Sequence, residues 1–484
     1  MAGHDFDPEG RRLPIKIDRA SNGEYAPLRL TRTQELARRL AHEAASENAR
    51  ALGLSRRAFL VSAAGAASTL SACNAANPDS RGGAFAVPAE AARDHDLAAA
   101  TVGGDEFIFD VQTHCVEPTG SWATGSTGQL WRTTLEQVFG QASKCTSGSF
   151  DCYSARMLAK EVFLDSDTDV AVVSALWGTP NPTPIDYAAE SREIIAAMGG
   201  EGARALIHGG VFPNEPGEIE AMDEKAQVYR VDAWKLYPQW GSDGRGFFLD
   251  TSDEAQHFYE KARQLGVTTV AVHKGVPLPR LDYDYSSPRD MGPAARANPD
   301  LTFLVYHAGF EGGVAEGPYD PADPKGVDRL IKSHQDAGFR PNEGNLYAEM
   351  GSLWRYFMTR PDEAAHVMGK LLKHFGEERI LWGTDSIWYG SPQDQIQAFR
   401  TFTISEEYQE RYGYPALTAQ AKRRIFGLNG ARVYGIDVGA LRQGSLDRRR
   451  ATYRQEPNPS FATFGPKSRR EFLALWDARG GRPG

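Results

Sequence analysis

Short apolar runs alternate with amphipathic segments along most of the chain, beginning near residue 105. The apolar runs are rich in β-branched and aromatic residues, and several lack the apolar–polar alternation of a half-exposed strand. Runs of this kind indicate parallel strands that are buried on both faces. Eight such strands are predicted, at residues 107–111, 170–176, 204–211, 230–237, 267–273, 301–307, 345–349 and 379–384.

The segments between these strands repeat apolar residues at helical spacing. They predict helices that include residues 187–198, 253–265, 327–337 and 362–375. Ser252 and Pro361 stand where two of these helices would begin, and Gly266 and Gly376 stand where two would end. Eight strand–helix alternations favour an α/β fold of the closed (β/α)8 TIM-barrel type over an open doubly wound sheet. No glycine-rich phosphate loop follows any predicted strand, which also disfavours a nucleotide-binding sheet.

The two ends of the chain do not follow this alternation. The pattern predicts a long N-terminal region (1–54), an export signal (55–86), a linker (87–104), the barrel (105–440) and a C-terminal extension (441–484). The long stretch between the first two strands is predicted to be an insertion over the barrel mouth. In the C-terminal extension, residues 469–478 predict a short helix on the outside of the barrel or on a second subunit.

An arginine pair, Arg56-Arg57, precedes Phe-Leu and an alanine-rich run that is too short to span a bilayer. This pattern resembles the twin-arginine signal that exports folded bacterial proteins, with a surface helix as the alternative. Two processing sites are readable, a lipobox that ends at Cys73 and a small-x-small site at 84–86. The expected partner is the twin-arginine export machinery. The expected location is the periplasm, either free or as a lipoprotein with a lipid anchor at Cys73.

Composition adds two constraints to this picture. The net charge is −9 although both ends of the chain are basic, so the body is strongly acidic. An acidic body repels phosphate backbones, and nucleic acid is therefore not an expected partner. Four cysteines are too few for a disulfide scaffold. Cys145 and Cys152 are close enough in sequence to pair in an oxidising compartment, and two free thiols are the alternative.

Polar residues fall at the C-terminal ends of the predicted strands, where TIM barrels hold their active sites. The first strand leads to Gln112 and His114, which strand alternation places on one face. His273, His307 and Asp385 close the fifth, sixth and eighth strands. Three imidazoles and a carboxylate that converge on one point suit a divalent metal ion such as zinc.

Further side chains near the strand ends predict a site for a small-molecule substrate. Lys235, in the fourth strand, is expected to be a cation that faces an anionic substrate, with a structural salt bridge as the alternative. Trp177, Tyr237, Lys274 and Trp388 follow strand ends and would wall a flat or aromatic substrate. Ordinary packing is the alternative for each of these four residues.

As a set, these motifs resemble the amidohydrolase superfamily, and in particular the amidohydrolase-related branch that includes amino-carboxymuconate-semialdehyde decarboxylase. The motifs are Phe-Asp-Val-Gln-Thr-His (109–114), Val-His (272–273), Tyr-His-Ala-Gly (306–309), Leu-Trp-Gly-Thr-Asp (381–385) and the closing segment 424–436. The resemblance implies that His114, His273 and Asp385 ligate one divalent ion, zinc or manganese. It also implies that Asp385 accepts the proton of a metal-activated water, and that His307 is a ligand or a general acid/base.

One position departs from the family pattern. The first strand of the family carries His-x-His, and this chain has Gln112 in the first place, where an amide oxygen would be a weaker ligand. Three functions therefore stay open. The first is hydrolysis of a small amide, ester or lactone, which the export signal favours. The second is non-oxidative decarboxylation of an aromatic or unsaturated carboxylic acid, and the third is a binding protein with a degenerate metal site. Members of this branch often form homodimers, so a homodimer is an expected assembly.

Overall fold

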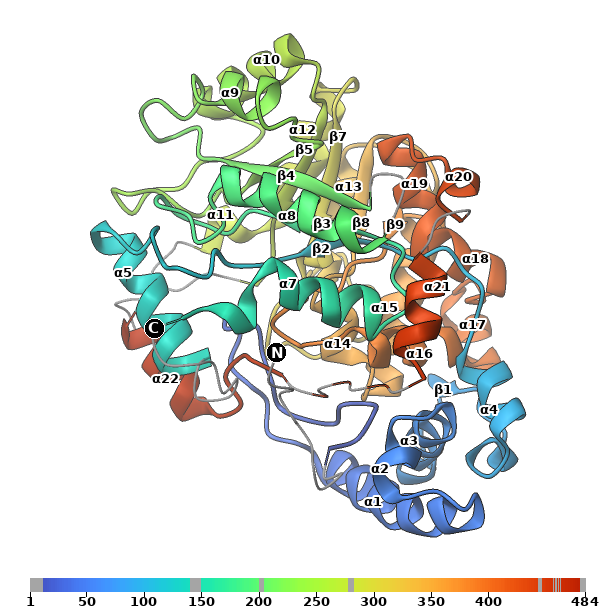
Figure 1. Cartoon of the computed structure of the whole chain (residues 1–484). Helices are drawn as coiled ribbons and strands as arrows, with labels where there is room; N and C mark the ends of the chain where they lie inside the picture. The colour runs from blue at the N-terminus through green and yellow to red at the C-terminus, as the bar shows by residue number, and fades with distance from the viewer. Residues whose placement is uncertain are drawn as a thin grey trace.

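The central sheet has eight parallel strands in sequential order, as the computed structural model shows (Figure 1). The structure describes residues 12–139, 149–199, 204–276, 283–442, 446–455, 457, 459, 461 and 463–478. The strands are β2 (Phe109–Thr113), β3 (Val170–Ser174), β4 (Ala205–Val211), β5 (Ala233–Leu236), β6 (Thr269–His273), β7 (Thr302–Tyr306), β8 (Leu346–Glu349) and β9 (Ile380–Leu381). Each overlaps one of the eight predicted strands, and the TIM-barrel prediction is confirmed.

The first and last strands close the sheet into a nearly complete barrel. Val111 N donates to Trp382 O at 3.0 Å, and Asp385 N donates to Gln112 O at 2.9 Å. Thr113 and Ser386 form a parallel bridge beyond the end of β9. Because all eight strands run in the same direction, their C-terminal ends surround one mouth.

Helices cover the outside of the barrel, and one of them shows the amphipathic pattern that places it there. In α10 (Asp253–Leu265) the buried positions Ala255, Phe258, Tyr259 and Ala262 follow helical spacing. This helix ends at Gly266, whose φ of +70° favours glycine. The other outer helices are α8 (Ile185–Gly199), α9 (Met222–Gln227), α11 (Tyr283–Ser286), α12 (Met291–Ala297), α13 (Val327–Asp336), α14 (Leu353–Phe357), α15 (Pro361–His374), α16 (Gln393–Thr401), α17 (Glu406–Tyr412), α18 (Ala419–Arg423) and α19 (Asn429–Tyr434).

The insertion after β2 lies on the mouth side of the barrel. It contains α5 (Gly125–Thr133), η2 (Thr134–Phe139), η3 (Asp151–Tyr153), α7 (Ala155–Leu158) and η4 (Ala159–Leu164). Trp122 and Trp131 share a buried apolar cluster with Trp388 and with Leu475 of α22 (Arg469–Ala478). The predicted C-terminal helix is therefore present. It packs on the insertion beside η2, as the neighbouring α5 and α22 show in Figure 1.

Two more helices of the C-terminal extension, α20 (Val438–Arg442) and α21 (Leu446–Tyr453), precede α22, and α21 packs on α8 and η4. Cys152 is disulfide-bonded, while Cys145, its predicted partner, lies outside the described residues. Cys73 and Cys115 are buried free thiols.

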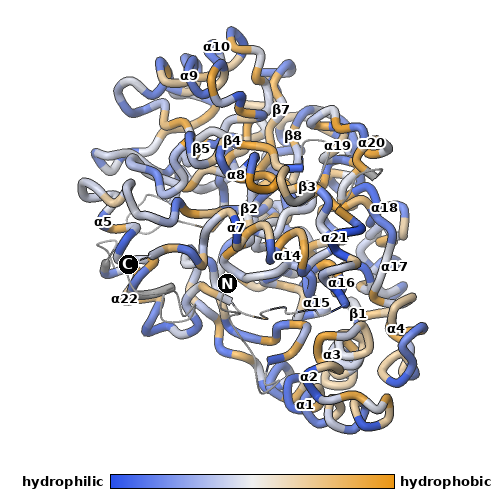
Figure 2. Tube along the Cα trace, in the orientation of Figure 1, coloured by the Kyte–Doolittle hydropathy of each residue, from blue (hydrophilic) through white to orange (hydrophobic). Residues whose placement is uncertain are grey.

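Residues 32–104, which include the predicted export signal and linker, form a helical layer against the barrel. This layer contains α1 (Arg32–Ala51), α2 (Arg56–Leu60), α3 (Ala63–Ala76), η1 (Ala89–Ala92) and α4 (His95–Val102), and the last two lie in the predicted linker. At the end of the predicted export signal, β1 (Gly83–Phe85) pairs antiparallel with β10 (Phe402–Ile404). Figure 2 shows hydrophilic and hydrophobic positions mixed along α1, which packs its alanine face on α3. Within the described ranges, no helix combines the length and the hydropathy that a membrane crossing needs.

The arginine pair lies inside this layer. The Arg56 guanidinium donates to the His42 carbonyl at 2.9 Å and to the Ser46 hydroxyl at 2.6 Å. Phe59 and Leu60, which follow the pair, are buried. The apolar residues of the signal-like motif therefore contribute to the hydrophobic core in this structure.

Candidate metal centre

Two histidines at the ends of neighbouring strands lie side by side at the barrel mouth. His273 closes β6 and His307 follows β7. The Nδ1 atom of His273 lies 3.2 Å from the Nε2 atom of His307. The other ring nitrogen of His273 faces the Val276 carbonyl at 2.9 Å, and that of His307 faces the Gly351 carbonyl at 2.8 Å.

These contacts determine where the ring protons are. A carbonyl only accepts hydrogen bonds, so each neutral ring must carry its proton on the nitrogen that faces the carbonyl. Burial lowers the pKa of both histidines, that of His307 to about 4 and that of His273 well below its ordinary value. Both rings are therefore neutral near pH 7, and two lone pairs face each other. A cation between them would relieve this repulsion.

A carboxylate from the N-terminal region completes this cluster. Glu24 Oε1 lies 3.8 Å from His273 Nδ1, and Glu24 Oε2 lies 3.8 Å from His307 Nε2. Ligand atoms about 2.0–2.2 Å from a tetrahedral zinc ion would lie about 3.3–3.5 Å apart. The donor types and their spacing therefore fit a divalent ion, and one oxygen and two nitrogens are a donor set typical of zinc. The outer nitrogens already donate to carbonyls, which orients both rings for such a role.

A second group, His114 and Asp385, lies beside this cluster. His114 Nδ1 lies 2.8 Å from the Ser174 carbonyl, and His114 Nε2 lies 3.1 Å from Asp385 Oδ1. Because a carbonyl and a carboxylate both accept, this arrangement needs a doubly protonated ring or a cation beside Nε2. Burial acts to raise the pKa of Asp385, but its hydrogen bonds with His114 and Ser352 hold it below its ordinary value.

Gln112 connects the two groups. Its Nε2 atom lies 3.2 Å from Asp385 Oδ1 and 3.4 Å from His307 Nε2. Within the part of the chain that the structure describes, its buried Oε1 atom has no hydrogen-bond partner. The predicted residues Gln112, His114, His273, His307 and Asp385 thus share one site. Among the described residues, the three donors with the spacing of a metal site are His273, His307 and Glu24.

Buried carboxylates behind the site hold the strand ends. Glu349 accepts hydrogen bonds from His307 N at 3.0 Å and Gly351 N at 2.6 Å. Asp110 accepts from Thr384 N at 3.0 Å, and burial raises the pKa of Asp110 to about 7. His307 and Asp385 have positive φ angles of 66° and 60°, a backbone conformation that costs free energy in non-glycine residues. This support keeps both functional side chains directed into the mouth.

The two predicted lysines have different surroundings. The Lys235 Nζ atom lies 3.5 Å from the centre of the Tyr306 ring and 4.5 Å from that of Tyr237. It is fully buried and has no hydrogen-bond partner among the residues described, and burial lowers its pKa to about 7. Lys274 instead pairs with Asp290 at 2.8 Å, and neither lysine lines the cavity at the histidines. Lys274 is therefore placed as part of a structural ion pair.

Only a small enclosed cavity of about 10 Å³ remains at the histidines, close to the size of one water molecule. Aromatic side chains wall it: Trp177, Tyr237 and Trp388, which were among the predicted residues, and Trp131. Its polar lining consists of Asn22, Glu24, Gln112, His114, His273 and Asp385. Asn22 and Glu24 have no signal in the sequence, because they precede the first barrel strand by more than 80 residues and fit neither a strand-end pattern nor a known motif.

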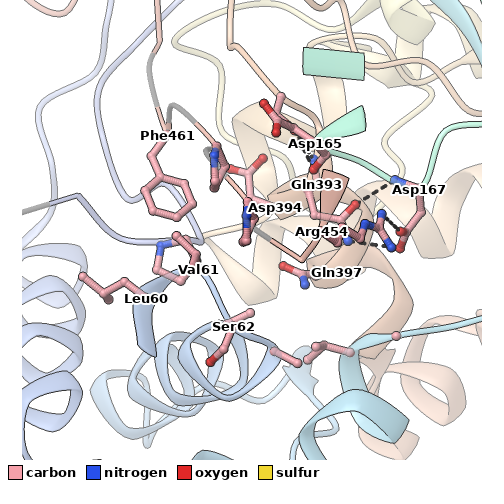
Figure 3. A pocket seen from close by; sticks show the side chains of 18 of the residues that line it. Leu60, Val61, Ser62, Asp165, Asp167, Gln393, Asp394, Gln397, Arg454 and Phe461 are labelled. Carbon is pink, nitrogen blue, oxygen red and sulfur yellow. Dashed lines mark hydrogen bonds and ion pairs between the residues drawn. The ribbon is translucent and has the colours of Figure 1, made fainter. Parts of the chain in front are cut away.

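A larger cavity of about 390 Å³ lies elsewhere, between the α2–α3 corner and the barrel (Figure 3). Its carboxylates are already paired. Asp167 accepts from Arg454 at 2.7 Å, and Asp394 accepts from Lys16 at 3.2 Å. None of the predicted site residues lines this cavity. The predicted site residues therefore gather at the barrel mouth and not in this larger cavity.

Comparison with known proteins shows the family of the chain. Residues 185–436, just over half of the chain, match the family model described as Amidohydrolase. The chain belongs to the amidohydrolase family. It is thus an enzyme of the amidohydrolase superfamily, whose members depend on metal ions. No curated relative matches this amidohydrolase at a significant level.

Several solved structures are similar to this amidohydrolase at low identity. The 5-carboxyvanillate decarboxylase of Novosphingobium aromaticivorans, solved with bound manganese, is 12% identical, with 70% of this chain and 99% of that chain covered and a TM-score of 0.43. The 2,6-dihydroxybenzoate decarboxylase of Rhizobium is 13% identical, covering 68% and 99%, with a TM-score of 0.37. The 4-oxalomesaconate hydratase of Rhodopseudomonas palustris is 15% identical, covering 69% and 98%, with a TM-score of 0.40.

Proposed function

We propose that this amidohydrolase is a metal-dependent hydrolase of a small amide, ester or lactone. The observation that carries the proposal is the pair of facing imidazole lone pairs of His273 and His307, next to the carboxylate of Asp385. These two histidines would hold one divalent ion, zinc or manganese. When bound, the ion would polarise the substrate and activate a water molecule.

Asp385 and His114 would handle the proton in this reaction. Asp385 is deprotonated at neutral pH because its pKa is held below the ordinary value, so it can accept a proton. His114 lies 3.1 Å from Asp385 Oδ1 and orients that carboxylate. Ser352 donates to the other oxygen at 2.6 Å, which fixes the plane of the carboxylate. The proton acceptor therefore enters the reaction already oriented.

The surroundings of the mouth favour a compact substrate with an anionic group. Lys235 lies behind Tyr237, outside the lining of the cavity, and its buried amine has no hydrogen-bond partner among the described residues. A substrate anion close to it would stabilise the ammonium form and raise its depressed pKa. Trp177 and Trp388 offer flat apolar surfaces beside the histidines. A small acid with a ring or an unsaturated chain has these features.

Non-oxidative decarboxylation is the second candidate, and the position of Lys235 favours it equally. A substrate carboxylate near this amine would lie in a buried part of the molecule, where its charge would be matched by the ammonium group. The same residues would then hold the carboxylate, and an acid at the site would protonate the carbon after carbon dioxide leaves. The two chemistries differ in their products.

Product analysis of the metal-loaded enzyme tests both candidates. Esters, lactones and amides with a carboxylate group, and matched aromatic carboxylic acids, would be incubated with the protein. Acid release in a pH-stat indicates hydrolysis of an ester or lactone, and release of an amine indicates hydrolysis of an amide. Bicarbonate production without a new carboxylic acid indicates decarboxylation. Elemental analysis of the purified protein comes first. If no metal binds, even after reloading, the enzymatic proposal fails and the binding-protein alternative takes its place.

Export by the twin-arginine route stays a prediction from the motif at Arg56-Arg57. So do periplasmic location, lipid anchoring at Cys73 and homodimer formation. We propose export and dimer formation as properties of the full chain, to be tested by fractionation and by light scattering. A lipid anchor at Cys73 would require cleavage ahead of that residue, and intact-mass measurement distinguishes this processed form from the full chain. Cleavage after the arginine pair would also remove the upstream segment, whose Asn22 and Glu24 line the cavity at the barrel mouth.

A further inference from the structure

The chain upstream of α1 crosses the barrel mouth, and we refer to residues 13–25 as the strap. We infer that the strap is a permanent part of the metal centre and that Glu24 is a ligand of the metal ion. In this role Glu24 replaces the first-strand imidazole that Gln112 does not supply. The inference rests on the proposed function and adds a ligand from outside the barrel to its site.

Local hydrogen bonds orient the Glu24 carboxylate toward the histidines. Glu24 N donates to Asn22 Oδ1 at 3.0 Å, which forms a tight turn at the end of the strap. Asn22 Nδ2 donates to Glu24 Oε2 at 2.6 Å and to Asp385 Oδ2 at 2.8 Å. One amide therefore joins the strap carboxylate to the barrel carboxylate. The Glu24 carboxylate is only 13% exposed, so a nearby cation would offset its desolvation.

The other end of the strap is held by buried ion pairs. The Lys16 ammonium donates to Tyr389 O at 2.9 Å and pairs with Asp394 at 3.2 Å. Asp18 pairs with Arg355 and accepts from Thr463 at 2.8 Å. Burial acts to raise the pKa of Asp18, but Arg355 holds it below the ordinary value. Removal of the strap would leave Asp394 and Arg355 as buried charges without these partners, which is strongly unfavourable.

Apolar contacts reinforce this anchoring. Leu13, Ile15 and Ile17 are buried in the main hydrophobic cluster. Tyr25 packs edge-on against Phe310 and Tyr356, and its hydroxyl lies 2.9 Å from that of Tyr389. A segment with this many buried partners is part of the native structure.

The location of the strap has a consequence for processing. Glu24 precedes Arg56-Arg57, so cleavage at Cys73 or after residue 86 would remove it together with Asn22. The active form of the protein must therefore retain its N-terminal region. If the chain is exported, the arginine motif acts without cleavage.

Metal affinity of the full-length protein tests the role of Glu24. Zinc affinity would be measured by chelator competition, and the coordination sphere by the visible absorption of the cobalt-loaded protein. Glu24→Gln keeps the size of the side chain and removes its charge. We expect it to weaken zinc binding by about 100-fold and to change the cobalt spectrum. Glu24→Asp has a carboxylate on a shorter side chain, and its zinc affinity should fall between those of the native protein and Glu24→Gln. The matched control is Glu43→Gln, an exposed carboxylate in α1, which should leave both readings unchanged.

The outcomes separate the inference from the function it rests on. Thermal unfolding first verifies that Glu24→Gln is folded. If His273→Ala loses the metal and Glu24→Gln binds it as tightly as the native protein, Glu24 is not a ligand and only the inference fails. A Glu24→Gln variant with higher metal affinity would instead show that the strap acts as an inhibitory plug. If the native protein binds no metal, both the inference and the proposed function are overturned.

Discussion

The strand ends of the barrel and the N-terminal strap reach the same site from opposite directions. His273 and His307 are placed by the parallel register of β6 and β7, because hydrogen bonds between neighbouring strands bring their C-terminal ends together. Glu24 belongs to no strand or helix, and it reaches the histidines through Lys16, Asp18 and Tyr25, which bind distant parts of the chain. The regular strands of the barrel therefore position most of this site. One metal-binding side chain, that of Glu24, depends only on contacts between distant parts of the chain.

Loss of a barrel histidine should have the largest effect on the metal site. His273→Ala removes one of the two facing nitrogens, and we expect metal binding and activity to be lost almost completely. Elemental analysis and turnover measure the two effects. His257→Ala, an exposed histidine in α10, is the control and should retain its metal. Full metal content in His273→Ala would mean that the ion is held by other residues.

Breaking an anchor of the strap should mainly affect stability. Lys16→Met leaves Asp394 buried without its ammonium partner, and we expect the free energy of unfolding to fall by about 3–5 kcal/mol. Denaturant unfolding measures the change. Lys325→Met, at an exposed ion pair with Asp323, should change stability by less than about 1 kcal/mol. Equal effects of the two substitutions would show that the strap is not anchored as described.

Lys235 links stability to pH. Burial lowers its pKa from 10.5 to about 7, so the unfolded chain binds more protons than the native protein between these values. The stability cost of Lys235 is therefore largest below pH 7 and disappears as pH rises toward 10.5. Lys235→Met should stabilise the protein by about 1–3 kcal/mol at pH 6 and by much less at pH 10. It should also raise the KM for an anionic substrate. A gain in stability that does not depend on pH would contradict this account.

A histidine at position 112 should have the smallest effect of these substitutions. It would show whether position 112 and Glu24 can substitute for each other as metal ligands. Gln112→His restores the imidazole of the family pattern, and we expect metal affinity to rise by about 10-fold. If that imidazole takes over the role of Glu24, Glu24→Gln will cost less affinity in this background than in the native protein. A double-mutant cycle measures the coupling. Strictly additive effects would show that the two positions do not substitute for each other.

Much of the barrel and of its site could be predicted from the sequence. Each of the eight predicted strands overlaps an observed one, because buried parallel strands have a local signature of continuous apolar residues. The rule that chemistry lies at the C-terminal strand ends then selected His114, His273, His307 and Asp385, and the structure places all four at the mouth. Trp177 and Trp388 followed by the same reasoning.

Other features depended on contacts that are distant in sequence. Lys274 is as close to a strand end as Lys235, yet its ammonium pairs with Asp290, and no local pattern announces that partner. The region 13–104 lacks the strand–helix alternation, so its helical layer and strap were not predicted. Strand periodicity is a short-range consequence of backbone geometry and burial, and it can be read residue by residue. The sequence alone therefore determined the barrel and the strand-end residues. Glu24 joins them only through tertiary packing. It lies more than 200 residues from His273 in the sequence, and the ion pairs and apolar contacts that bring it there form only when the whole chain folds.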